Sequence, residues 1–87
     1  MKSRILIVED ERHIGVLIKF NCEAEGYEAT LVEDGPSALE LFERESDPFD
    51  LVILDLMLPQ MSGYAVLEKL RSSAIYVPVL ILTACTL

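Results

Sequence analysis

Short apolar runs alternate along this chain with longer stretches that repeat at helical spacing. Residues 4–8 form a run that predicts a strand. A helix is predicted next and ends before Gly26, because glycine commonly follows the last turn of a helix. The positions that recur at helical spacing in it are Ile14, Leu17, Ile18, Asn21 and Cys22.

The same order of strand and helix recurs through the rest of the sequence. Strands are predicted at 27–32, 51–54 and 79–82, and helices over 36–42 and 66–70. Strands without polar alternation belong in a parallel sheet that is covered on both faces. Repeated β-α-β units with right-handed crossovers then predict an open α/β fold of three layers.

The fourth predicted strand, residues 79–82, is apolar enough to need neighbours on both sides, yet the sequence stops at Leu87. We therefore expect one domain over residues 1–87, truncated after four strands and three helices. An exposed apolar edge strand invites pairing with another chain. A homodimer formed through that edge is the resulting hypothesis.

Charge and composition restrict the function classes. The chain has 15 acidic and 7 basic residues and a net charge of -8, which argues against direct binding to nucleic acid. Cys22 and Cys85 are too few for a disulfide framework or a zinc site, and neither is expected to have a function. No stretch approaches the roughly 20 apolar residues that span a membrane, so the cytoplasm is the expected compartment.

Acidic side chains stand at the ends of two predicted strands. Glu9 and Asp10 follow the first apolar run, Asp55 follows the third strand, and Thr83 follows the fourth. Ligands of such sheets bind outside the carboxyl ends of the strands. If the first and third strands are neighbours, three like charges converge there and need protons or a cation to compensate them.

Mg²⁺ suits an all-oxygen donor set of this kind better than zinc does. A carboxylate beside Mg²⁺ can attack an activated phosphoryl group, which would leave an acyl phosphate on Asp55. The Thr83 hydroxyl could then contact a phosphoryl oxygen. A single Asp after a strand is more often a turn or cap residue, so the hypothesis depends on the whole group.

Four segments of the chain read Ile5-Leu6-Ile7-Val8-Glu9-Asp10-Glu11, Asp50-Leu51-Val52-Ile53-Leu54-Asp55-Leu56-Met57-Leu58-Pro59, Ser62-Gly63 and Leu82-Thr83-Ala84. In their order and spacing they resemble the receiver domain of bacterial two-component response regulators. The resemblance implies a flavodoxin-like fold. The loop from Leu58 to Gly63 is similar to that of regulators with a winged-helix DNA-binding domain.

The resemblance also implies roles for single residues. Asp55 would accept the phosphoryl group from a sensor histidine kinase, and Asp10 would bind Mg²⁺ directly with support from Glu9. Met57 would offer its backbone carbonyl to the metal. Thr83, followed by Ala84, would be the switch residue that contacts the phosphoryl group. Receivers of this kind catalyse only their own phosphorylation and dephosphorylation and are not otherwise enzymes.

The family pattern continues through another helix, a fifth strand with a lysine before proline, and a last helix, and this sequence has no counterpart to them. Lys2, Lys19 and Lys69 do not match that lysine by position. A docking module that binds a kinase without being phosphorylated is therefore an alternative function. A phosphatase of the haloacid dehalogenase type is disfavoured, because it needs Asp at position 57, which is Met.

Overall fold

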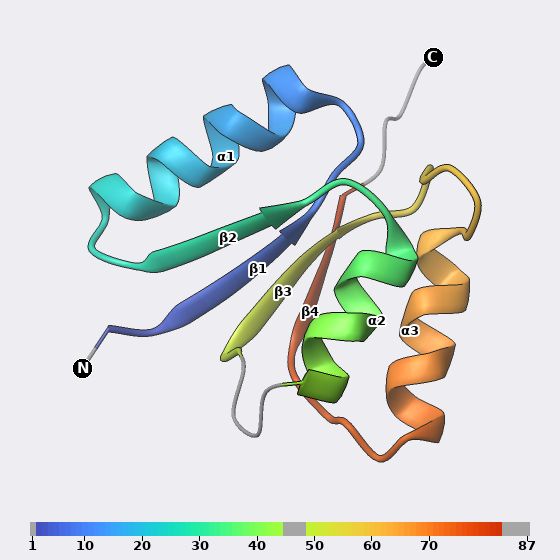
Figure 1. The fold of residues 1–87 in the computed structure, drawn as a ribbon. Helices are drawn as coiled ribbons and strands as arrows, with labels where there is room; N and C mark the ends of the chain where they lie inside the picture. The colour runs from blue at the N-terminus through green and yellow to red at the C-terminus, as the bar shows by residue number, and fades with distance from the viewer. Residues whose placement is uncertain (1, 45–48, 83–87) are drawn as a thin grey trace.

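The computed structural model describes residues 2–44 and 49–82, which form a four-stranded parallel sheet with helices on both faces (Figure 1). The strands are β1 (Arg4–Val8), β2 (Glu28–Val32), β3 (Leu51–Asp55) and β4 (Val79–Leu82), and the helices are α1 (Arg12–Ala24), α2 (Gly35–Arg44) and α3 (Gly63–Ser72). Each predicted element is present, with bounds that differ by a few residues. The flavodoxin-like arrangement is confirmed.

The strand order is β2-β1-β3-β4, so β1 and β3 are neighbours although α1, β2 and α2 separate them in the sequence. The register pairs Ile7 with Ile53 and Val8 with Leu54. The condition for the acidic residues to converge, adjacent first and third strands, is therefore met. Both strands end at the same edge of the sheet because they are parallel.

Two apolar layers hold the helices on the sheet. Alternate strand residues Leu6, Val8, Val52 and Leu54 face α2 and α3, where they pack with residues such as Val66. Residues of opposite parity, among them Ile5, Ile7 and Ile53, face α1. The same strand thus supplies both layers because successive side chains point to opposite faces.

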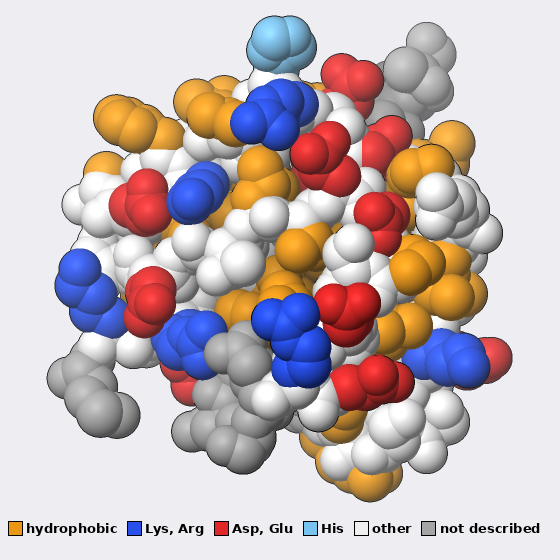
Figure 2. Space-filling view, viewed as in Figure 1, with side chains coloured by type: hydrophobic (Ala, Val, Ile, Leu, Met, Phe, Trp, Pro, Cys, Tyr) orange, Lys and Arg blue, Asp and Glu red, His pale blue; other side chains and the backbone are white. Residues whose placement is uncertain are grey.

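The helical repeat of α1 corresponds only partly to its buried face. Ile18 and Cys22 pack against the core, as the sequence predicts for Cys22, whereas Ile14 and Leu17 are largely exposed. Other exposed hydrophobic side chains lie among charged ones on the surface seen in Figure 2. No helix within residues 2–44 and 49–82 is long and apolar enough to cross a membrane.

Candidate functional site

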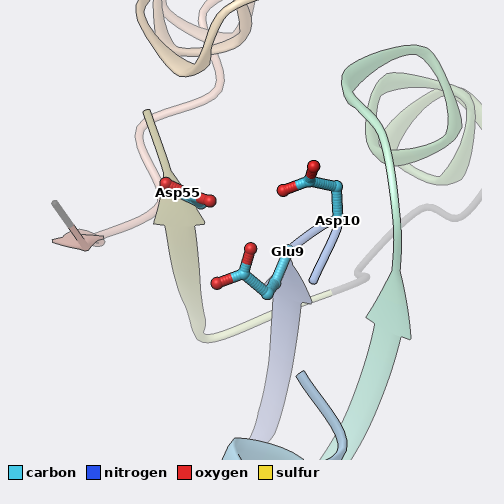
Figure 3. A group of neighbouring side chains, drawn as sticks. All are labelled: Glu9, Asp10 and Asp55. Carbon is cyan, nitrogen blue, oxygen red and sulfur yellow. The ribbon is translucent and has the colours of Figure 1, made fainter. Parts of the chain in front are cut away.

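The carboxyl ends of β1 and β3 bring three acidic side chains together. Glu9 and Asp10 directly follow β1, and Asp55 is the last residue of β3. One carboxylate oxygen from each lies within 4.8 Å of the other two. Figure 3 shows the three side chains directed toward a shared space between the two strand ends. The structure therefore places together the three acids that the sequence singled out.

The three carboxylates differ in their exposure to solvent. Glu9 is only 3% exposed, Asp55 is half-buried and Asp10 is exposed. The Glu9 amide donates to the Val32 carbonyl of β2 at 3.0 Å, which extends the strand pairing through Glu9. The side chain of Glu9 is consequently held inside the site, while its neighbour Asp10 reaches the surface.

Backbone donors fix two of the carboxylates. The Met57 amide donates to Asp55 Oδ1 at 3.0 Å, and the Glu11 amide donates to Glu9 Oε2 at 3.2 Å. Each bond spans two residues and closes a short turn just after a strand, which is a common arrangement for Asp and related side chains. These bonds fix one oxygen of each carboxylate beside the group of three acids.

The pKa of Glu9 is raised to about 7, first by burial and then by the hydrogen bond with Asp55 and the negative charge of Asp55. The Glu11 amide opposes this by lowering the pKa of Glu9. A buried acid beside two other acids is stabilised in its protonated form, because like charges so close together repel. A cation at the site would relieve this conflict.

The donor set fits a hard divalent cation. All three side chains offer carboxylate oxygens, and among the described residues this is the group of His, Cys, Asp and Glu side chains that could share one ion. Mg²⁺ is bound in proteins through one or two carboxylates, with waters and phosphate oxygens completing its shell. The partly open position of the site, with Asp10 exposed, leaves room for such ligands.

The loop between β3 and α3 passes very close to Asp55. Gly63 is buried, and a Cβ atom there would lie 2.5 Å from the Asp55 carbonyl oxygen and 2.7 Å from the Leu56 Cα. The Gly63 amide donates to the Leu56 carbonyl at 3.1 Å. Only glycine fits this contact, so the glycine in the Ser62-Gly63 motif has a steric function beside the site.

A cleft of about 470 Å³ opens beside the acids. Glu9, Asp10, Glu11 and Asp55 supply its charged part, and the hydrophobic side chains of Ile14, Ile18, Met57 and Leu82 supply the rest. Sequence reasoning did not place Ile14, Ile18 or Leu82 at the site, and for Met57 it named only the backbone carbonyl. The helical spacing of Ile14 and Ile18 predicts that they share one face of a helix. It does not predict that this face lies beside the ends of β1 and β3.

Three predicted site roles are not tested by the structure. Thr83 and Ala84 lie outside the described residues, and the role of the Met57 carbonyl stays a prediction. Burial raises the pKa of the Cys22 thiol, which disfavours a reactive thiolate.

Comparison with known proteins identifies the family of this site. The model of the response regulator receiver domain family matches residues 5–86. The sensory transduction protein RegX3 of Mycolicibacterium smegmatis is 51% identical over 82 residues, which cover 94% of this chain and 35% of that protein. The alkaline phosphatase synthesis transcriptional regulatory protein PhoP of Bacillus subtilis is 40% identical, with 97% and 34% covered.

Solved structures similar to this fold include a response regulator and a receiver domain, in agreement with the family match. The response regulator TrrA from Thermotoga maritima, determined in complex with Mg²⁺-BeF, superposes with a TM-score of 0.87 at 40% identity and covers 99% of this chain and 72% of that one. The receiver domain of the Pseudomonas aeruginosa sensor histidine kinase PA1611, with magnesium in its active site cleft, has a TM-score of 0.87 at 32% identity, with 97% and 69% covered. The chain spans about a third of the length of the curated relatives.

Proposed function

This chain belongs to the family of response regulator receiver domains, and from that membership we propose that Asp55 accepts a phosphoryl group in a Mg²⁺-dependent reaction. The donor is a phosphorylated histidine of a sensor histidine kinase. The observation that carries the proposal is the convergence of Glu9, Asp10 and Asp55 at the ends of two adjacent parallel strands.

Asp55 is better suited than its neighbours to be the nucleophile. Glu9 is almost fully buried, and its raised pKa keeps part of it protonated near neutral pH. Asp10 is exposed, whereas Asp55 is half-buried in the cleft wall with one oxygen fixed by the Met57 amide. A carboxylate oxygen held in one orientation can approach phosphorus in line with the leaving group, which is the geometry that phosphoryl transfer requires.

Glu9, Asp10 and Asp55 would hold the metal, with the Met57 carbonyl as a further ligand. Bound Mg²⁺ supplies positive charge that offsets the negative charge on the phosphoryl oxygens. Two neighbours, TrrA and the PA1611 receiver domain, are described as holding magnesium, which supports this assignment. The chain's own contribution is to place three carboxylates on one side of the incoming group.

The signal then passes to other surfaces. Thr83 and Ala84 are proposed to contact the phosphoryl group, and α1 beside the site is proposed to meet the kinase. Relatives such as PhoP are transcriptional regulators, so control of transcription is the proposed output of a protein that contains this domain. The domain is a signalling module whose chemistry is limited to its own phosphorylation and dephosphorylation.

The test is the intact mass of the protein before and after incubation with acetyl phosphate, with Mg²⁺ or with EDTA. We expect the mass of one phosphoryl group to be gained with Mg²⁺ and not with EDTA. Hydroxylamine should remove it, because an acyl phosphate is cleaved by this nucleophile. The Asp55→Asn protein should gain nothing.

Two results would contradict the proposal. A gain that persists in Asp55→Asn would place the modification elsewhere. No gain in the unaltered protein would favour the alternative function, a module that docks to a kinase without accepting its phosphoryl group. Binding of the kinase measured by calorimetry would then separate a docking module from an inactive sample.

A further inference from the structure

The strand β2 forms one edge of the sheet in the part of the chain that the structure describes. β1 pairs with one side of β2, and no strand of the described residues pairs with its other side (Figure 1). An edge strand presents backbone N–H and C=O groups that can pair with a strand of another chain. β1 separates this edge from β3 and therefore from Asp55.

The pairing with β1 shows which backbone groups of β2 point outward. The Glu28 amide donates to the Ser3 carbonyl at 2.9 Å, and the Val32 carbonyl accepts from the residue after β1 at 3.0 Å. Successive residues of a strand direct their backbone groups to opposite sides, so those of Ala29 and Leu31 point away from β1. The amides and carbonyls of these two residues are therefore directed at the open side of the strand.

A groove of about 410 Å³ lies between α1 and this edge. Val16 and Phe20 of α1 and Leu31 of β2 supply its hydrophobic surface. Val16 and Phe20 are four residues apart on one face of the helix, and they are 48% and 67% exposed. The groove shares no residue with the cleft beside Asp55, so it is a separate feature of the molecule.

The strand edge and the groove together suit one ligand, an extended peptide. Leu31 faces α1, where it lies beside Gly15. A residue of an added strand that stands opposite Leu31 directs its side chain to the same face of the sheet. That side chain would enter the groove and contact Val16 and Phe20. In strand addition, backbone hydrogen bonds to an edge provide affinity, and such side-chain pockets provide specificity.

Charge restricts the kind of peptide. The groove is lined by four charged residues, Arg12, Lys19, Glu23 and Glu33. Their charges balance, and Arg12 is already paired with Glu33 at 3.3 Å. The net charge of -8 of the whole chain therefore attracts a positively charged peptide and repels a second copy of the chain. The apolar β4 offsets such repulsion through burial, whereas β2 begins with the exposed Glu28.

We propose that the edge of β2 and the groove beside it bind an extended, positively charged segment of another protein. The segment adds to the sheet as a further strand, with hydrogen bonds to the backbone of Ala29 and Leu31. One of its hydrophobic side chains lies in the groove between Val16, Phe20 and Leu31. Because Asp55 is not involved, this binding is independent of the proposed phosphorylation.

The experiment uses labelled peptides in which lysine alternates with valine around a central phenylalanine. One peptide has an ordinary backbone. A second is N-methylated at its lysines and a third at its hydrophobic residues. Successive N–H groups of a strand point to opposite sides, so only one of the two methylated peptides loses the donors that face β2.

Fluorescence anisotropy measures binding of these peptides to the unaltered protein, to Phe20→Ala and to the matched control Leu17→Ala. Leu17 lies on the same helix with similar exposure, 60% against 67% for Phe20, but does not line the groove. Both side chains are so exposed that their truncation leaves the core intact. Amide hydrogen exchange followed by NMR reports on the backbone of β2.

We expect Phe20→Ala to weaken binding of the ordinary peptide by on the order of tenfold, because the groove loses hydrophobic contact area. Leu17→Ala should leave binding unchanged. One methylated peptide should bind as the ordinary one does, and the other should bind by on the order of tenfold more weakly, since it lacks the backbone donors. The bound peptide should slow exchange of the Ala29 and Leu31 amides.

The inference is overturned if no peptide binds, or if Phe20→Ala and Leu17→Ala bind the ordinary peptide equally. It is also overturned if both methylated peptides bind as the ordinary one does, because attraction to an acidic surface alone would give that result. Protection of the Ala29 and Leu31 amides at high protein concentration without peptide would identify a second copy as the occupant, and this would overturn it too.

Discussion

At the scale of single residues, the site derives its chemistry from unequal surroundings of similar side chains. Glu9 and Asp10 are adjacent in the sequence, yet Glu9 is 3% exposed and Asp10 lies at the surface. Burial and the proximity of Asp55 raise the pKa of Glu9, because both disfavour its charged form. The surroundings of single residues give two testable predictions, an electrostatic one at Glu9 and a steric one at Gly63.

Glu9→Gln should remove a pH dependence of folding stability. The pKa of Glu9 is about 7 in the folded protein against 4.5 for the unperturbed group, so the folded state holds more protons between those values. The free energy of unfolding should therefore fall as pH rises from 4.5 to 7, by on the order of 3 kcal/mol at most, and stay lowered above that range.

Urea unfolding with EDTA at pH 5 and pH 8 measures this effect. Glu9→Gln should lose less stability between the two pH values than the unaltered protein does. Glu68→Gln, at an exposed position on α3, serves as the control and should retain the original difference. Equal pH dependence of the unfolding free energy in Glu9→Gln and Glu68→Gln would show that the Glu9 carboxyl is not its source.

Gly63→Ala should destabilise the domain through a steric clash next to Asp55. The new methyl group would lie 2.5 Å from the Asp55 carbonyl oxygen, and backbone atoms cannot move aside as a flexible side chain can. We expect a loss of about 1–3 kcal/mol in the free energy of unfolding, measured by urea denaturation.

Gly26→Ala gives a useful comparison for that variant. Gly26 has a φ of +93° but no heavy atom within 4 Å of the added Cβ, so only its backbone conformation is penalised. A Gly63→Ala protein as stable as the unaltered chain would mean that the loop after β3 can move away from Asp55 at little cost.

At the scale of elements, the helix α3 follows the loop after Asp55, and the two ends of this helix are capped differently. At its start, the Ser62 Oγ accepts from the Ala65 amide at 3.2 Å, as expected of a serine N-cap. At its end, the Ile75 amide donates to the Leu70 carbonyl and the Ala74 amide to the Arg71 carbonyl, at 2.9 and 3.0 Å. This is the Schellman pattern, which normally has glycine at the position of Ala74.

Ala74→Gly should therefore stabilise the protein. Ala74 has a φ of 61°, a left-handed conformation that costs an L-residue roughly 1–2 kcal/mol and glycine almost nothing. Glycine also loses more entropy on folding, so the net gain should be about 0.5–1 kcal/mol in the free energy of unfolding. Thermal and urea denaturation measure it.

The matched control is Ala65→Gly in the first turn of the same helix. It should lower stability by about 1 kcal/mol, because glycine is the weaker helix former there. If both substitutions lower stability equally, the left-handed residue at position 74 does not cost what its conformation implies.

At the scale of the whole molecule, the sheet has an apolar strand at one edge of its described part. β4 pairs with β3 on one side, and no strand within residues 2–44 and 49–82 pairs with its other side. Leu80 and Ile81, which point to opposite faces of the sheet, are 52% and 38% exposed. An edge strand with apolar side chains on both faces is a site for pairing with another chain.

A polypeptide of these 87 residues should therefore self-associate as its concentration rises. Light scattering after size-exclusion chromatography over a wide concentration range measures the effect. Leu80→Lys should weaken association, since a lysine on an edge strand opposes pairing, whereas Tyr76→Lys, in the loop before β4, should not. A monomer at every concentration would rule out pairing through this edge.

The amino-acid sequence by itself determined the identity and order of the strands and helices, because apolar runs and helical repeats are local patterns. It also determined which acids end the strands, and the family to which the chain belongs. Tertiary structure decided what depends on contacts between distant segments. It placed β1 beside β3, buried Glu9 but not Asp10, and set Ile14 and Ile18 against the acidic site. Burial and the interaction between the charges of Glu9 and Asp55 arise from packing across the sheet. No local pattern could therefore predict the pKa of Glu9 or the hydrophobic side chains beside Asp55.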